Sequence, residues 1–503
     1  MDNDIRETTI QSLAASVAGS VLAFDGSPSA AVSGLAYDSR RVRPGDLFFC
    51  IQGERADGHN HAHTAAKHGA AALCVMRELD VPLPQIVVSD TRAAMPVISA
   101  TFLGNPADDL RLLGVTGTNG KTTTAFLLDS IATASGDVTG LVGTIETRVA
   151  GVVRPGVRTT PESLDLQLLL RDMKSSGVET VAMEVTSHAL RLNRVDAMRF
   201  SAAGFTNLSQ DHLDFHLDMD DYFEAKRSLF TPEHARRGAI NIDDPWGERL
   251  LISASIPCLG FGANGRGDVQ ATGISSDGSG SRFTLHTPDG DADIATHLPG
   301  PFNVSNCLAA ATIALIGGIS LDAIVEGIYG LRAVPGRFES IAAGQAFPVI
   351  VDYAHTPDSL ENILRAAREL VVGEGRLIAV FGCGGDRDRK KRPLMGVAAA
   401  RLADVLVVTS DNPRSEDPQA ILDEITKGVV SERGGPPDAE MVDRRAAIAL
   451  AVASARPGDV VVIAGKGHEM GQQFATETVP FDDRIVAAEE IQRISTESGS
   501  VAR

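Results

Sequence analysis

"GVTGTNGKTTTAFLLDSIATA", residues 114–134, is the stretch that decides the fold. An apolar run enters a turn that is rich in glycine, and a helical pattern begins at Lys121. Such a turn points backbone N–H groups and the positive end of a helix at an anion. The strict phosphate-loop consensus would place glycine where Val115 stands, so an ordinary turn between strand and helix is the alternative. Because a strand, Gly-Lys-Thr and a good helix occur together, we expect phosphate binding, with Lys121 at the phosphates and Thr122 at Mg²⁺.

Composition narrows the class of protein. A chain of 503 residues is long enough for about three domains, each with its own core. With 65 acidic and 46 basic residues the formal charge is −19, which argues against a broad nucleic-acid surface. The five cysteines form no C-x-x-C pair, which favours reduced thiols in a cytoplasmic protein. No apolar run approaches the roughly 20 residues of a membrane span.

Apolar strand patterns alternate with helical patterns along the chain, which predicts an α/β fold. We expect domains at residues 1–108, 109–335 and 336–503, the second with a mostly parallel sheet and the third doubly wound like a Rossmann domain. The Gly/Ser-rich stretch "SSDGSGSRFTLHTPDGDAD" is expected to form hairpins outside the main sheet.

Ordered motifs along nearly the whole chain give the most specific signal. They are "YDSRRVRPGDLF", "RTTPES", "MEVTSHAL", "NLSQDHLDFH", "YFEAKRSLF", "PGPFNVSN", "VPGRFE", "DYAHTPDSL", "GCGGDRDRKKRPLM", "DNPRSEDP" and "GKGHE". With these motifs and its variant loop, the sequence resembles the Mur ligase family, ATP-dependent enzymes that form amide bonds on peptidoglycan precursors. The resemblance implies a uridine-nucleotide domain first, a P-loop ATPase domain second and an amino-acid domain third.

The resemblance also implies which residues hold ATP and magnesium. Catalytic roles fall to Lys121, Glu184, His212 and Lys226, and the Mg²⁺ ligands would be Thr122, Glu184, His212, which serves a second magnesium, and Lys226 as a carbamate derived from CO2. The ATP contacts would be Gly117, Thr118, Asn119, Gly120, Lys121, Thr122, Thr123, Asn303, Asn306, Arg337, Asp352 and His355. Taken alone, Glu184 could be a solvated strand end, His212 a capping or packing residue, and each remaining polar residue a cap or turn.

Lys226 is the most informative single residue. Tyr222, Phe223, Leu229 and Phe230 share its helix face, so the lysine is expected to turn toward the interior. Burial would lower its pKa and make the neutral amine available, which suits the carbamate that the resemblance implies. A lysine whose head snorkels to water is the alternative.

Two further substrate groups follow from the resemblance. The uridine-nucleotide substrate, UDP-N-acetylmuramoyl-L-alanyl-D-glutamate, would contact Tyr37, Ser39, Glu54, Arg55, Ala56, Arg158, Thr159, Thr160, Thr186, Leu192 and Arg194. The incoming amino acid, meso-diaminopimelate, would contact Arg387, Asp411, Asn412, Pro413, Arg414, Gly465 and Glu469. Arg414 of "DNPR" is the candidate for bidentate binding of its distal carboxylate, and an exposed loop arginine is the alternative.

The implied reaction transfers the γ-phosphoryl group of ATP to the D-glutamate side chain, and the amine then displaces phosphate from the acyl phosphate. A lysine-adding muramyl ligase is the main alternative and should lack DNPR. A folate-polyglutamating ligase should lack the first domain, and a non-catalytic nucleotide-binding scaffold would not need Glu184, His212 and Lys226 together. The histidines of "GHNHAH" lack zinc spacing with other ligands. We expect a monomer.

Overall fold

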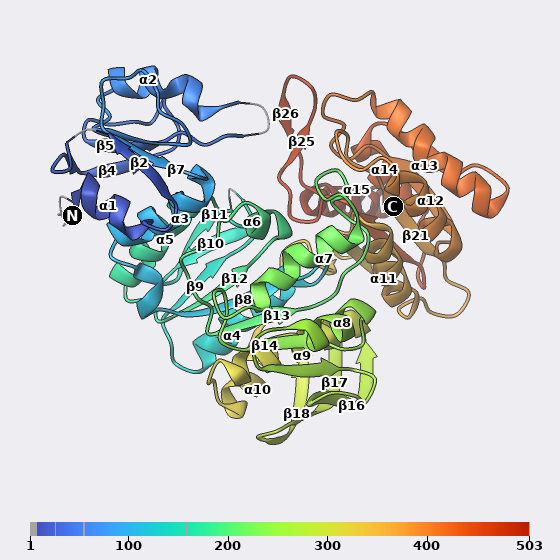
Figure 1. Cartoon of the computed structure of the whole chain (residues 1–503). Coiled ribbons are helices and arrows are strands. Elements are labelled where there is room, and N and C mark those ends of the chain that lie inside the picture. Colours follow the sequence, from blue (N-terminus) through green and yellow to red (C-terminus); the bar gives the residue numbers. More distant parts are fainter. Residues whose placement is uncertain (1–7, 26, 54–55, 157, 502–503) are drawn as a thin grey trace.

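The computed structural model describes residues 8–25, 27–53, 56–156 and 158–501. Three units follow one another along the chain, each built on its own sheet (Figure 1). The central unit, in cyan to yellow, lies between the N-terminal unit in blue and the C-terminal unit in orange and red. This arrangement confirms the predicted three-part α/β fold, whereas the expected domain boundaries stay predictions.

The N-terminal unit carries a five-stranded sheet in the order β2-β7-β6-β5-β4, parallel except for β2. Strands β5 to β7 are buried throughout, as expected where both faces of a parallel sheet are covered. A short β1–β3 pair lies beside it. Its elements are β1 (Thr8–Thr9), α1 (Ile10–Ser16), β2 (Val21–Asp25), β3 (Ala31–Val32), β4 (Gly34–Ala36), β5 (Asp46–Phe49), the 3-10 helix η1 (Gly58–His61), α2 (Ala62–Lys67), β6 (Ala72–Val75), β7 (Gln85–Val88), α3 (Thr91–Phe102) and η2 (Pro106–Asp109).

The central unit carries an eleven-stranded sheet in the order β11-β10-β9-β12-β8-β13-β14-β15-β16-β17-β18. The strands from β9 to β16 in this order are parallel, and the two ends are antiparallel. The strands are β8 (Arg111–Thr116), β9 (Thr139–Val142), β10 (Glu146–Val149), β11 (Val152–Pro155), β12 (Thr180–Glu184), β13 (Ala202–Phe205), β14 (Gly238–Asn241), β15 (Cys258–Gly262), β16 (Val269–Asp277), β17 (Gly280–Thr287) and β18 (Gly290–Thr296). The helices are α4 (Lys121–Ala134), α5 (Ser163–Ser175), α6 (Ser187–Arg191), α7 (Met219–Arg227), η3 (Ser228–Phe230), α8 (Pro245–Ser253), α9 (Pro301–Ile316) and α10 (Leu321–Gly330).

The expected place of the Gly/Ser-rich stretch is wrong. It does form hairpins, but β16, β17 and β18 continue the main sheet. The physical reason is the alternation along β17 and β18, which turns Phe283, Leu285 and Ile294 inward onto the core that also holds α9. The polar residues between them face outward, so composition alone gives the appearance of a loop.

The C-terminal unit carries a six-stranded sheet in the order β19-β20-β24-β21-β22-β23, parallel except for β19. Helices cover both faces over two separate apolar clusters, which confirms the predicted doubly wound arrangement. A small β25–β26 hairpin lies apart from the sheet. Its elements are β19 (Glu339–Ser340), β20 (Val349–Asp352), α11 (Pro357–Arg368), β21 (Leu377–Phe381), α12 (Lys391–Leu402), β22 (Val405–Thr409), α13 (Pro418–Arg433), β23 (Ala439–Met441), α14 (Arg444–Ser454), β24 (Val460–Ala464), β25 (Gly471–Gln473), β26 (Thr478–Pro480) and α15 (Asp483–Val501).

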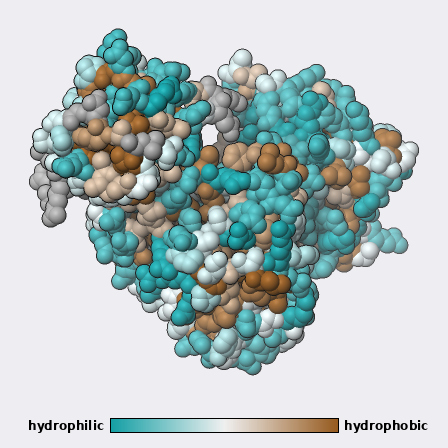
Figure 2. Space-filling view, in the orientation of Figure 1, coloured by the Kyte–Doolittle hydropathy of each residue, from teal (hydrophilic) through white to brown (hydrophobic). Residues whose placement is uncertain are grey.

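The surface is mainly hydrophilic on the face shown in Figure 2, with scattered apolar residues. Among the described residues, no helix combines the length and apolar character that a membrane span needs. All five cysteines are free thiols, as expected from their spacing.

Candidate active site

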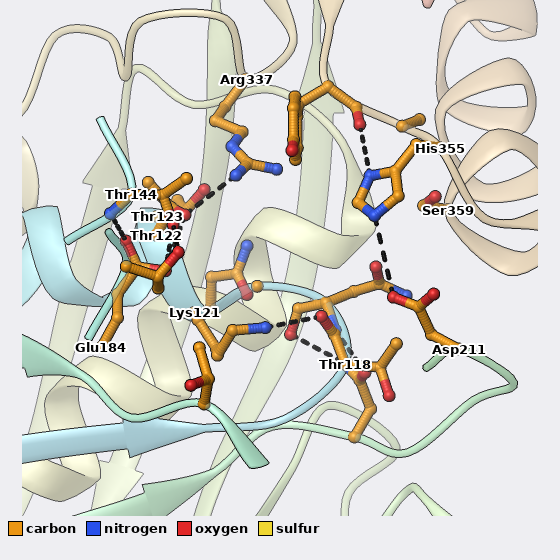
Figure 3. Close-up of a pocket in the computed structure, with 18 of the residues that line it drawn as sticks. Thr118, Lys121, Thr122, Thr123, Thr144, Glu184, Asp211, Arg337, His355 and Ser359 are labelled. Atoms are coloured by element: carbon orange, nitrogen blue, oxygen red, sulfur yellow. Dashed lines mark hydrogen bonds and ion pairs between the residues drawn. The ribbon is translucent and has the colours of Figure 1, made fainter. Parts of the chain in front are cut away.

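A cavity of about 590 Å³ lies where the central and C-terminal units meet. On the central side it is formed by the turn after β8, the end of β12 and the segment after β13. These are neighbouring strands, and ligands of open α/β sheets bind at their carboxyl ends. On the C-terminal side it is lined by Arg337 and by the segment from Asp352 to His355. Figure 3 shows side chains from both units pointing into this space.

The turn between β8 and α4 has the geometry of an anion-binding loop. Gly117 and Gly120 adopt φ of 150° and 85°, values that favour glycine. A Cβ on Gly117 would lie 1.9 Å from the Thr206 hydroxyl oxygen. Gly114 is still within β8, where a Cβ would press on the Phe200 ring at 2.8 Å. Packing therefore requires glycine at both Gly114 and Gly117. Val115, by contrast, is a buried residue of β8, where a side chain fits.

Lys121 opens α4 and folds back over this loop. Its Nζ donates to the carbonyls of Gly117 at 2.9 Å and Thr118 at 2.8 Å (Figure 3). Desolvation lowers the pKa of Lys121, and the nearby Glu184 opposes the shift. A cation held at the rim of a loop of N–H donors suits a phosphate chain.

Glu184 and Thr122 form the hard-oxygen end of the cavity. The Thr122 hydroxyl donates to Glu184 Oε2 at 3.0 Å, and Thr144 donates to the same carboxylate through its amide and its hydroxyl. Arg337 reaches across from the C-terminal unit and donates to Thr122 Oγ1 at 2.9 Å (Figure 3). A carboxylate beside a threonine hydroxyl fits Mg²⁺, which is commonly bound by one or two protein oxygens together with substrate phosphates.

Lys226 lies behind the loop and is only 1% exposed. Its Nζ donates to the Gly117 carbonyl at 2.8 Å and sits 4.7 Å from the centroid of the Tyr222 ring. Burial holds the pKa of Lys226 well below its usual value, and Lys121 adds to the shift. The expected burial is confirmed, so the snorkelling alternative is wrong, while the carbamate stays a prediction.

His212 lines the same cavity in a left-handed conformation, with φ of 55°. Its Nε2 lies 3.4 Å from Asp211 Oδ2, and desolvation lowers the pKa of the ring. Of the four expected magnesium ligands, Thr122 and Glu184 are hydrogen-bonded to each other, and the metal-binding roles of all four stay predictions. Among the described residues, no group of three or more His, Cys, Asp or Glu side chains is placed to hold a metal ion.

Most residues expected to contact ATP line the cavity, namely Thr118, Asn119, Gly120, Lys121, Thr122, Thr123, Asn306, Arg337, Asp352 and His355. Asn303 lies behind and accepts a hydrogen bond from Asn306 at 3.0 Å. Both Asp352 oxygens accept backbone N–H groups, from Phe338 and Ala354, so this carboxylate also fixes its own turn.

The residues expected to contact the uridine-linked substrate divide into two groups. Arg158, Thr159, Thr160, Thr186 and Arg194 line the cavity. Outside the lining are Tyr37, whose hydroxyl donates to Asp165, Ser39, whose carbonyl contacts His68, and Ala56 and Leu192. Glu54 and Arg55 lie outside the described residues.

The residues expected to bind the amino acid gather near the carboxyl ends of β22 and β24. Asn412 donates to Glu469 Oε2 at 2.7 Å, and Arg414 donates to the Gly385 carbonyl and the Gln473 side chain. Burial lowers the pKa of Arg414, and the nearby charge of Arg387 lowers it further, so the two guanidinium groups share one region. Pro413 and Gly465 supply backbone here, and a Cβ on Gly465 would lie 3.1 Å from Asp411 Oδ2.

Sequence reasoning missed several residues of these sites. Lining residues that it did not assign include Thr144, His188, Asn207, Asp211, Tyr353 and Ser359. Glu162 accepts from Arg158 and Arg194, both at 2.7 Å, and Lys466 is buried among the amino-acid residues. Some of these missed residues lie inside the motifs quoted above, and those motifs could have pointed to them: His188, Asp211, Glu162 and Lys466.

Comparison with known proteins agrees with this architecture. Family models match at residues 31–103 (Mur ligase family, catalytic domain), 115–314 (Mur ligase middle domain) and 336–467 (Mur ligase, glutamate ligase domain). UDP-N-acetylmuramoyl-L-alanyl-D-glutamate–2,6-diaminopimelate ligase of Syntrophomonas wolfei is 48% identical over 92% of this chain and 96% of its own. The ligase of the same name from Streptomyces coelicolor is 47% identical over 94% of each chain. A solved structure of a ligase of that name has a TM-score of 0.69 and 31% identity, covering 97% of this chain and 99% of its own. From its three matched regions and its identity to these full-length relatives, the chain belongs to the Mur ligase family.

Proposed function

We propose that this chain is an ATP-dependent ligase that joins meso-2,6-diaminopimelate to the D-glutamate of UDP-N-acetylmuramoyl-L-alanyl-D-glutamate in peptidoglycan precursor synthesis. The observation that carries the proposal is one cavity in which a phosphate-type loop, the Thr122–Glu184 pair and Arg194 face one another. The relatives of high identity, which are ligases named for these two substrates, support it.

ATP would bind with its phosphates at the loop, where the amide groups at the start of α4 and Lys121 offset negative charge. Thr122 and Glu184 would hold Mg²⁺, which when bound neutralises phosphate charge. Arg337 already donates to Thr122 from the C-terminal unit, so it would approach the same phosphates. Lys226, as a carbamate, and His212 would complete the metal-binding side.

The uridine-linked substrate would place its D-glutamate carboxylate beside Arg158, Thr159 and Arg194, which line the cavity next to Glu184. Transfer of the γ-phosphoryl group would give an acyl phosphate, and the amine of the amino acid would then displace phosphate. No side chain needs to act as a nucleophile. The contribution of this chain is to hold three substrates in line and to keep water away.

Arg414 favours diaminopimelate over lysine. Its guanidinium is half-buried and its Nη1 is held by the Gly385 carbonyl, so it is positioned before any ligand arrives. The distal carboxylate of diaminopimelate could pair with it in bidentate geometry, which lysine cannot do. A lysine-adding activity stays the alternative.

A phosphate-release assay with the uridine-linked dipeptide, ATP and a panel of amino acids tests the proposal. We expect release with meso-diaminopimelate, little with L-lysine and none without the dipeptide. Release that is faster with lysine would favour the alternative, and release independent of any amino acid would refute ligation. The expected domain boundaries, monomeric state and cytoplasmic location stay predictions.

A further inference from the structure

Lys466 is a buried cation that the catalytic scheme above does not use. It lies two residues after the end of β24, and its side chain is 0% exposed. Its Nζ lies 3.0 Å from Asn412 Oδ1, 3.1 Å from Glu469 Oε2 and 3.6 Å from Asp411 Oδ1. A buried ammonium persists only where acceptors and opposite charge surround it. All three acceptors belong to residues that are proposed to bind the amino acid.

Lys466 and the Gln473 backbone N–H together fix which way the Asn412 amide points. The oxygen and nitrogen of an amide can exchange places, and its hydrogen-bond partners decide between the two orientations. Here Oδ1 accepts from both Lys466 Nζ and the Gln473 amide at 2.9 Å. The amide nitrogen is thereby directed at Glu469, to which it donates at 2.7 Å.

Within the described residues, the side-chain hydrogen bonds of Glu469 lie on one side of its carboxylate. Lys466 and Asn412 both reach Oε2, and neither hydrogen bond involves Oε1. The side chain of Glu469 remains 30% exposed, whereas Lys466 is fully enclosed. The carboxylate is therefore anchored from the protein side while an oxygen is left for a ligand.

The Asp411 carboxylate, beside Lys466, also needs a positive charge nearby. Its side chain is 8% exposed, and Oδ1 is buried without a hydrogen-bond partner among the described residues. The nearest positive charge is offered by Lys466 beyond ordinary hydrogen-bond distance, at 3.6 Å. Lys466 is therefore the charge that compensates this buried carboxylate oxygen inside the protein, which leaves the other Asp411 oxygen for a ligand.

We propose that Lys466 is a positioning residue for the amino-acid substrate. Its charge orients Asn412 and Glu469 and keeps two carboxylates close together, so that their remaining oxygens face one ammonium group of a zwitterionic amino acid. Lys466 does not itself touch the substrate. The inference rests on the proposed function, because it assigns this cluster to the amino acid rather than to ATP.

The test measures Michaelis constants for three variants of the full chain. Lys466→Met removes the charge at similar length, Lys466→Arg keeps the charge with another donor geometry, and Lys427→Met is a control at an exposed lysine of α13. We expect Lys466→Met to raise the KM for meso-diaminopimelate about tenfold or more, since it leaves buried acceptors unsatisfied, with the KM for ATP changed less than about twofold. Lys466→Arg should give a smaller selective rise, and Lys427→Met none.

Two results would overturn the inference. One is an unchanged amino-acid KM in Lys466→Met; the other is an equal rise for ATP and the amino acid, which would mean general damage to the fold. If Lys466→Met fails to fold, the same two constants in Lys466→Arg decide, where only a selective rise supports the proposal. The assays use whichever amino acid gives phosphate release with the unaltered chain. A wrong substrate assignment would therefore show as a different preferred amino acid in the unaltered chain. A wrong role for Lys466 would show only in the KM values of the variants.

Discussion

The burial of Lys226 on the packed face of α7 determines both the pKa and the position of its amine. The interior position that lowers its pKa also places its amine beside the Gly117 carbonyl, directly under the loop. A neutral amine can react with CO2, whereas the ammonium form cannot. The carbamate so formed would turn a buried cation into an anion that can face magnesium.

We therefore expect Lys226→Ala to lose most turnover while the thermal midpoint shows an intact fold. Short carboxylic acids should restore part of the activity by standing in for the carbamate. Phosphate-release rates with and without added acetate or formate measure this, with Lys427→Ala, at an exposed position of α13, as the control. Near-normal activity in Lys226→Ala would remove the residue from the metal site.

Arg414 should set the choice of amino acid and leave ATP use unchanged. A charge-assisted pair contributes about 1.5–3 kcal/mol, so Arg414→Ala should lower kcat/KM for meso-diaminopimelate by about 10- to 10²-fold. The KM values for ATP and the dipeptide should change little, because their proposed contacts lie in other parts of the molecule.

Steady-state kinetics with one substrate varied at a time decide the point. Arg401→Ala, on the exposed end of α12, is the matched control. If selectivity for diaminopimelate over lysine stays the same in Arg414→Ala, the specificity role is wrong.

Residue-level prediction from the sequence succeeded where spacing carried the information. The burial of Lys226 followed from Tyr222 and Phe223 on the same helix face. Prediction from the sequence failed where a residue's contact partners come from distant segments of the chain. Lys466 contacts Asn412, which is 54 positions away, and Glu162 accepts a hydrogen bond from Arg92 of the N-terminal unit. Neither contact produces a periodic pattern in the sequence.

At the scale of elements, the junction of β8 and α4 should tolerate no side chain at Gly117. An alanine there combines a left-handed φ with a contact to Thr206, whereas Gly136, with φ of 90°, has open space around its Cβ position. Both substitutions carry a backbone strain of roughly 1–3 kcal/mol, and only the one at Gly117 adds the contact with Thr206. Gly117→Ala should thus destabilise the protein more than Gly136→Ala and should raise the KM for ATP.

Thermal midpoints and ATP kinetics of the two variants separate strain from contact. Equal losses of stability with an unchanged KM for ATP would show that the loop can shift to accept a Cβ.

Element prediction depended on whether apolar residues run together or alternate. The loop between β8 and α4, and the buried strands β20, β21, β22 and β24, were predicted because each strand is a continuous apolar run. The strands β16 to β18 were misplaced because one of their faces is solvated, and their serines and glycines hide the alternation.

At the scale of the whole molecule, buried histidines should make stability depend on pH. Desolvation lowers the pKa of His188 to about 4 and of His468 to about 3. In the unfolded chain these rings take up protons near pH 6.5, so the unfolded state binds more protons as the pH falls below that value. Above about pH 6.5 these histidines should not change the free energy of unfolding. As the pH falls from there toward about 4, the free energy of unfolding should decrease.

Thermal midpoints of the unaltered chain and of His468→Gln, measured from about pH 8 to about pH 5, test this. The variant should lose less stability over that range, and comparison at the alkaline end isolates any packing defect. Parallel curves for the two proteins would contradict the prediction.

The strand order of the C-terminal sheet has a consequence for how the chain is made. In the central sheet, β13 to β18 are added one beside another in chain order, so each new strand can pair as it leaves the ribosome. In the C-terminal sheet, β24 is inserted between β20 and β21, which come out long before it. Until β24 is translated, both of these buried, apolar strands present an unpaired edge, the feature that leads nascent chains to aggregate. Chains cut short just before Val460 should accordingly collect in the insoluble fraction, whereas chains that include β24 should stay soluble.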